Sequence, residues 1–140
     1  MKKSKFVSFF ITVVMCLGLL TIPSFAMEYR ASAQISIYDI KVTPVTNSIV
    51  VTFSVTGRGT MEKLGCESIE IYEKIGSRWD EIASCDENDE DMSIFNNASY
   101  TNSISFDGER GVEYMVKVTI FAENSAGRDT RSRTFYVTGQ

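Results

Sequence analysis

The sequence predicts an all-β protein whose folded part is a single antiparallel seven-stranded β-sandwich. Three observations carry this prediction. Residues 112–122 place apolar side chains at every second position, which is the side-chain period of a β-strand. Shorter alternating segments recur along the chain and are separated by turn-forming residues. No segment after the apolar start has the 3.6-residue period of an amphipathic helix.

The start of the chain predicts an export signal, which occupies residues 1–26. Three lysines precede an apolar run over residues 6–20, and small residues follow at Ser24 and Ala26. This order is typical of a secretory signal peptide, so we expect cleavage after Ala26, with residues 31–33 as an alternative cleavage site. A retained membrane anchor is the rival interpretation, although the apolar run is short for a full span. The expected location is therefore secreted or extracellular, without membrane contact after cleavage.

Composition narrows the expected function. Cleavage would leave eleven Lys and Arg residues against eighteen Asp and Glu, a net charge of −7. An acidic surface argues against nucleic acid and anionic membranes as partners. The chain has no histidine, which removes the commonest general base and most zinc sites. We therefore expect no enzyme, no catalytic residue and no cofactor, and a small secreted hydrolase is a remote alternative.

Residues 27–34 are polar and predict a flexible arm in front of a domain that spans residues 35–140. The first strand changes the parity of its apolar positions near Tyr38, which predicts a bulge, and Pro44 is expected to end it. Three glycines between residues 57 and 65 predict a loop. The seven strands are expected over residues 35–42, 49–55, 69–72, 79–82, 100–106, 112–122 and 130–138.

Residues 69–82 predict a β-hairpin with Ile75 and Gly76 as its two-residue loop. This register pairs Tyr72 with Trp79 and Cys66 with Cys85. Cross-strand Cβ atoms lie close enough for a disulfide, and two cysteines in a small exported domain indicate one. A redox-active pair is the alternative, although its usual Cys-x-x-Cys spacing is missing.

Five acids occupy the six positions of residues 86–91, which predicts a solvated loop. Asp86, Asn88 and Glu90 carry oxygen ligands at alternating positions, the chemistry that Ca²⁺ prefers. The EF-hand pattern fails, because Asp91 stands where the glycine of that motif belongs. We expect a plain solvated loop, with these three residues as the candidate metal ligands if the loop binds Ca²⁺.

Arg128, Arg131 and Arg133 form a basic stripe near the last strand. Charged side chains commonly protect the exposed edge of a sheet, which is the interpretation we favour. Contact with an anionic partner, such as a cell-wall polymer, is the alternative.

Residues 35–138, most of the chain after the predicted signal, resemble a fibronectin type III domain, an immunoglobulin-like β-sandwich. The resemblance rests on residues 79–82 as a fourth strand, 111–114 as the corner that enters strand F, and 116–127 as strand F with its exit turn. It implies structural roles for Trp79 and Tyr114, whose hydroxyl would bond back to the preceding loop. The layout also resembles small exported proteins of Gram-positive bacteria that have no assigned function. Both resemblances concern the fold and transfer no active site.

The expected function is a secreted, non-enzymatic binding module for a protein or glycan at the cell envelope or outside the cell. Residues 57–65 and the acidic loop are the expected recognition surface, because binding residues concentrate on loops. The alternative is a structural protein of the envelope that assembles through its last strand. The sequence does not identify the ligand or the oligomeric state.

Overall fold

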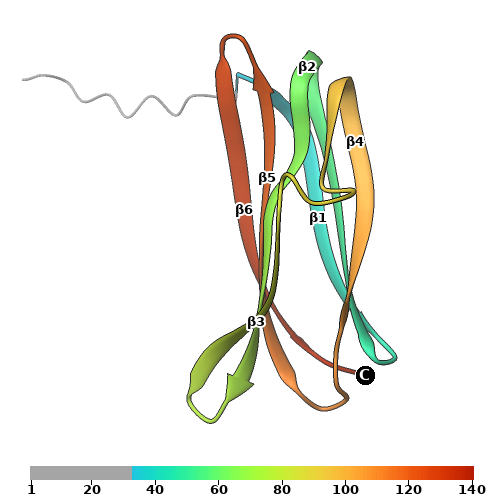
Figure 1. Ribbon diagram of the computed structural model, residues 1–140, viewed down its shortest axis with the longest axis vertical. Helices are drawn as coiled ribbons and strands as arrows, with labels where there is room; N and C mark the ends of the chain where they lie inside the picture. Colours follow the sequence, from blue (N-terminus) through green and yellow to red (C-terminus); the bar gives the residue numbers. More distant parts are fainter. Residues whose placement is uncertain (1–32) are drawn as a thin grey trace, which may run out of the picture. The chain divides into compact units, whose positions relative to one another are not determined.

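The computed structural model describes residues 33–140, all of which belong to one compact unit (Figure 1). The predicted signal peptide and the first six residues of the predicted arm lie outside the described residues. Gln34, the last residue of that arm, is buried, and its backbone N–H donates to Asp129 Oδ2 at 2.8 Å. Its carbonyl accepts from the backbone N–H of Arg58 at 2.8 Å. Gln34 is therefore part of the packed domain and not of a flexible arm.

All secondary structure in the described part of the chain is β, and every strand pairing is antiparallel. The all-β, antiparallel prediction is therefore confirmed. Six strands are formed, not seven, and residues 33–140 contain no helix long and apolar enough to cross a membrane. The strands are β1 (Ile35–Val45), β2 (Ser48–Ile75), β3 (Arg78–Asp86), β4 (Ser93–Asp107), β5 (Glu113–Asn124) and β6 (Gly127–Thr138).

The long strand β2 explains why six strands are formed where seven were predicted. Its first half pairs with β1 and β4, and its second half pairs with β3 and β5. Between the halves, where a loop was predicted, the chain bends near Gly59, whose φ is +104°, and stays paired with β4 from Met61 onward. A glycine reaches this φ without a Cβ clash, so the strand turns over without ending. In Figure 1, β2 rises beside β1 and β4, bends, and descends beside β5.

The two halves of β2 face each other across one apolar core, which gives a β-sandwich-like arrangement. Val51, Phe53 and Val55 of the first half are fully buried, as are Ile69 and Ile71 of the second. The inward residues of β5 complete this core; they are Tyr114, Val116, Val118, Ile120 and Ala122. Fully burying an aliphatic side chain contributes about 1.5–3 kcal/mol, so this alternating pattern supplies most of the driving force for the fold.

Strand β1 departs from its predicted form at two positions. Its register with β2 shifts between Ile35 and Ile37, ahead of the bulge predicted near Tyr38, and the side chain of Ile37 is exposed. Pro44 does not end the strand, because β1 continues to Val45. β1 lies at one end of the strand order, and an edge strand tolerates a proline on the side that has no partner.

The predicted hairpin is formed by β2 and β3, but its register was predicted wrongly. Ile75 pairs with Arg78, so that Gly76 and Ser77 make the two-residue loop. The loop needs a positive φ at its first residue, and Gly76 supplies it with a φ of +64°. The predicted loop would have placed Ile75 at that position, where its Cβ is disfavoured. Trp79 consequently lies opposite Lys74 and not opposite Tyr72.

The predicted Cys66–Cys85 disulfide is not formed, and both cysteines are free thiols. The corrected loop and a bulge in β3 at Ile82 place Cys85 opposite Ile69, three residues away from the expected partner. Cys66 lies beyond the end of the β2–β3 ladder and is paired with Ile120 of β5. The disulfide prediction depended on the register and failed with it.

Candidate functional site

One row of side chains crosses four neighbouring strands on the outer face of the β3–β2–β5–β6 layer. The row consists of Trp79 on β3, Lys74 on β2, Glu113 on β5 and Thr138 on β6. Tyr136 projects from the same face of β6, because strand residues two positions apart share a face. The intervening residue Val137 packs against the core instead. The alternation that builds the core therefore also gathers these polar and aromatic groups outside it.

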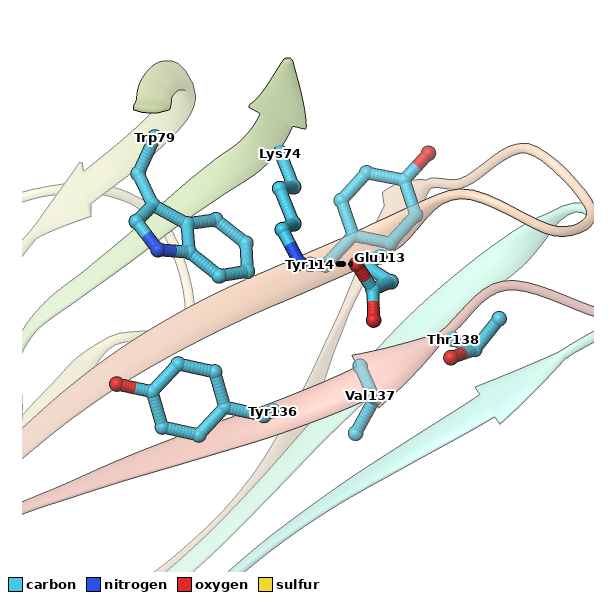
Figure 2. A pocket seen from close by; sticks show the side chains of 7 residues that line it. All are labelled: Lys74, Trp79, Glu113, Tyr114, Tyr136, Val137 and Thr138. Atoms are coloured by element: carbon cyan, nitrogen blue, oxygen red, sulfur yellow. Dashed lines mark ion pairs between the residues drawn. The ribbon is translucent and has the colours of Figure 1, made fainter. Parts of the chain in front are cut away.

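These side chains line a hollow of about 210 Å³ (Figure 2). The rings of Trp79 and Tyr136 form one side, with centroids 5.7 Å apart and planes inclined at 56°. Tyr136 is 68% exposed, although it is among the largest side chains in the protein, and Trp79 is half-buried. Exposed aromatic side chains of this kind are enriched at binding surfaces, because they combine apolar area with a polar tip.

An ion pair forms the other side of the hollow. Lys74 Nζ lies 2.8 Å from Glu113 Oε2, and both side chains remain accessible to solvent. The same ammonium group lies 5.9 Å from the centroid of the Trp79 ring, within range of a cation–π attraction. The hollow thus presents a hydrogen-bond donor, an acceptor and an aromatic face while its two charges cancel.

Tyr114 and Trp79, for which structural roles were predicted, both line this hollow. Tyr114 is buried, and its hydroxyl accepts a hydrogen bond from the backbone N–H of Glu109 at 2.8 Å. The hydroxyl therefore ties the loop before β5 to the strand. Trp79, unlike Tyr114, lies outside the core cluster and faces the hollow.

Two other hollows have less specific linings. One of about 550 Å³ lies at the C-terminal end and contains Arg110 as its one charged side chain. Another, of about 340 Å³, lies against β3 and the end of β4, where Ile82 and Phe106 line it together with Asp107 as its charged residue. Neither combines aromatic faces with a paired donor and acceptor.

The acidic loop forms a hydrogen-bonded turn. Asp86 Oδ1 accepts from the N–H of Asn88 at 2.8 Å, and Asn88 Oδ1 accepts from Lys63 Nζ at 3.3 Å. Glu90 is exposed, and residues 33–140 contain no group of three or more His, Cys, Asp or Glu side chains arranged to hold a metal ion. Two of the three candidate calcium ligands thus accept protein hydrogen bonds in this structure, and calcium binding stays an untested prediction.

The three arginines do not form a basic stripe. Arg128 lies on the outer face, where it contacts Glu67, Glu87 and Glu123 at 2.8–3.2 Å. Arg131 and Arg133 pair with Ile120 and Val118, so they belong to the opposite face. The Arg133 guanidinium lies 5.3 Å from the Tyr38 ring centroid. The structure thus contradicts a continuous anion-binding stripe, because β6 distributes these residues between its two sides.

Neither cysteine has the character of a redox-active thiolate. Burial raises the pKa of Cys66 to about 12, and its single S–H is shared between the carbonyls of Thr119 and Ser68, which lie 3.3 and 3.4 Å from Sγ. Burial, together with the nearby charges of Asp89 and Asp86, also raises the pKa of Cys85. A reactive cysteine needs the opposite shift.

Tyr136, Lys74 and Glu113 of the hollow were not predicted from the sequence as site residues, and only Tyr136 had a signal that could have found it. Its neighbours Phe135 and Val137 are apolar, which is typical of inward-facing positions in the strand expected over residues 130–138. The outward position of Tyr136 follows from the side-chain alternation of a strand. Pairing it with Trp79 required the register of β3, which was predicted wrongly.

The comparisons with known proteins give no family assignment. No protein-family model matches the chain, and no curated protein is found as a relative.

Proposed function

We propose that the protein is a secreted, non-enzymatic binding module whose ligand occupies the Trp79–Tyr136 hollow. The observation that carries the proposal is the exposed ring of Tyr136, held beside Trp79 and the Lys74–Glu113 ion pair. All four side chains stand on paired strands, which hold a constellation more precisely than loops do. Export is retained from the sequence pattern of residues 1–26.

The proposed scaffold is a fibronectin III-like sandwich. Counting the two halves of β2 as separate strands gives seven strands in two layers, which is the number such a domain has. The Tyr114 hydroxyl bond supports this proposal, because it joins the start of β5 to the preceding loop in the manner of a tyrosine corner. In such a scaffold Phe53 would take the core position where the family usually has a tryptophan. Its ring is fully buried, and its centroid lies 5.8 Å from that of Tyr100.

The binding function is tested with Tyr136→Ala on an array of extracellular glycans and proteins. Hot-spot aromatic residues contribute about 2 kcal/mol or more, so we expect the variant to lose at least roughly tenfold in affinity. Phe95→Ala is the matched control, because Phe95 is 64% exposed and stands on β4, outside the hollow. Absence of binding by the wild-type protein, or equal binding by the Tyr136 variant, would refute the proposal.

The second candidate function is assembly through β6. Among the described strands, β6 pairs only with β5, so one side of its 12-residue backbone has no strand partner. Such an edge can accept another chain. Size-exclusion chromatography with light scattering distinguishes the two candidates, since a monomer at micromolar concentration contradicts assembly and an oligomer that Thr134→Pro dissociates supports it.

A further inference from the structure

We propose that the ligand of the hollow is a neutral saccharide, one ring of which stacks on Tyr136 while its hydroxyl groups bond to Lys74 and Glu113. This inference rests on the proposed binding function and assigns the chemical class of the ligand. The geometry of the two aromatic rings, the hydrogen-bonding capacity of the ion pair and the charge balance of the hollow each favour this class.

The aromatic geometry suits one flat, weakly polar face. The C–H bonds of a sugar ring carry partial positive charge, and the face of an aromatic ring is negative, so the two attract when they stack. Trp79 and Tyr136 are inclined at 56°, so a single flat ring cannot lie against both. Tyr136 is the more exposed of the two and provides the platform, while Trp79 forms a side wall (Figure 2).

The ion pair distinguishes a saccharide from a peptide. Lys74 can only donate hydrogen bonds, and ionised Glu113 can only accept them. A sugar hydroxyl both donates and accepts, so neighbouring hydroxyls satisfy both groups, which lie 2.8 Å apart. An extended proline-rich peptide offers mainly carbonyl acceptors, so it would desolvate Glu113 without giving it a donor.

The charge balance favours a neutral ligand. Lys74 and Glu113 cancel each other within the hollow, and the whole chain carries a formal charge of −4. A polyanionic saccharide would meet Glu113 and the long-range field of an acidic protein. The volume of about 210 Å³ lies below the 300–1,000 Å³ typical of enclosed small-molecule sites, which fits one unit of a chain bound at an open surface.

Trp79 is the single tryptophan of the chain, so its fluorescence reports directly on the hollow. We would titrate the protein with three neutral hexasaccharides, namely cellohexaose, chitohexaose and mannohexaose, and with hexagalacturonic acid and octaproline for comparison. At least one neutral hexasaccharide should shift the emission saturably and bind at least about tenfold more tightly than the other two probes. Calorimetry on the same samples gives the affinity independently of fluorescence.

Two variants separate the contribution of the Glu113 hydrogen bond from that of stacking on Tyr136. Glu113→Ala leaves both rings in place and should weaken binding about tenfold or more through the lost charged hydrogen bond. Tyr136→Ala should abolish the stacking, and its affinity is measured by calorimetry because the substitution alters the surroundings of Trp79. Phe95→Ala should bind like the wild-type protein.

The outcomes for the two proposals are distinguishable. If no neutral hexasaccharide binds, or if binding is unchanged by Glu113→Ala and Tyr136→Ala, the saccharide inference is wrong. Tyr136-dependent binding of octaproline or of an arrayed protein would then leave the binding function standing with a different ligand. Failure of every probe on both assays would overturn the binding function as well.

Discussion

The buried thiol of Cys66 makes the stability of the protein depend on pH in the alkaline range. Burial raises its pKa in the folded state to about 12, whereas an unfolded thiol titrates near 8.5. Between these values the unfolded chain binds fewer protons than the folded protein, so stability is complete below about pH 8.5 and falls as the pH rises toward 12.

We therefore expect the free energy of unfolding to decrease between pH 8 and pH 10.5, and to decrease less in Cys66→Ala. Urea denaturation at both pH values gives the change of the unfolding free energy with pH for each protein. This change does not depend on any cavity that the substitution creates. In the wild-type protein at pH 8, iodoacetamide should modify Cys85 before Cys66, as mapped by peptide mass. Equal pH slopes, or faster modification of Cys66, would contradict its burial as a thiol.

Gly65 of β2 lies in close contact with the start of β4. Its φ is +152°, and a Cβ at this position would overlap the carbonyl oxygen of Met92 and lie 2.7 Å from Ser93 Cα. The overlap is with backbone, so no side-chain rotation relieves it, and Gly65→Ala should destabilise the fold by about 1–3 kcal/mol.

Gly59→Ala is the matched comparison for thermal unfolding. Gly59 also has a positive φ, but a Cβ there meets no atom within 4 Å. Its variant should therefore show backbone strain alone and a smaller loss of melting temperature than Gly65→Ala. An equal or larger loss for Gly59→Ala would show that steric overlap at Gly65 has been relieved by a shift of β4.

At the scale of elements, a charged network fastens the acidic turn to the outer face of the sheet. Glu87 in the turn contacts Lys63 Nζ at 2.9 Å and Arg128 at 3.2 Å. The Arg128 guanidinium lies 3.8 Å above the centroid of Phe121, a ring that is fully buried outside the main core cluster. The turn is therefore an attached part of the fold and less suited to recognition than a free loop.

Glu87 should make this attachment sensitive to acid. Burial alone would raise the pKa of its carboxyl, but hydrogen bonds and charge from Lys63 and Arg128 outweigh burial and lower the pKa. As the pH falls below the unfolded value of about 4.3, the unfolded chain takes up the proton first, so the stabilisation is present above that pH and is lost below it.

Urea denaturation between pH 6 and pH 3.5 tests this dependence with Glu87→Gln. The variant should be less stable at pH 6 by about 1–2 kcal/mol and should lose less stability on acidification than the wild-type protein. Glu90→Gln is the control, because Glu90 is an exposed acid of the same turn. If Glu87→Gln lost as much unfolding free energy on acidification as the wild-type protein, the ion pairs would not be what holds the turn.

The sequence predicted the interiors of the strands more accurately than the connections between them. The alternation at residues 112–122 predicted the burial of Val116, Val118 and Ile120 correctly, because a one-residue slip would expose all of them. The bend of β2 was predicted as a loop, because glycines that permit positive φ occur both in loops and in strand bends. The β3 register depended on which hairpin residue takes the positive φ, and that choice moved Cys85 away from Cys66.

The candidate site was also predicted only in part, because it depends on how the strands pair. Trp79 was identified from sequence, but as a structural residue, and Tyr136 was not identified. Residues 74 and 79 belong to one hairpin, but residues 113 and 136 are distant in the sequence and reach them only through the pairings of β5 with β2 and with β6. A binding site spread over four strands leaves no local motif, which is why the loops at residues 57–65 and 86–91 were favoured as the recognition surface.

At the scale of the whole molecule, the outer face of the β3–β2–β5–β6 layer has two differently built ends. The network around Arg128 and Phe121 closes one end with internal ion pairs. The Trp79–Tyr136 hollow leaves the other end open, with an exposed ring and a solvent-accessible ion pair. The first end therefore stabilises the fold, and the second end is the proposed ligand-binding surface.

Chemical-shift mapping by NMR tests this assignment most directly. The ¹⁵N-labelled protein is titrated with cellohexaose, chitohexaose and mannohexaose, and the amide and indole N–H signals are followed. We expect the largest shifts at Lys74, Glu113, Tyr136 and the Trp79 indole. Shifts confined to residues 57–61 or 86–92, with the hollow unperturbed, would contradict this assignment.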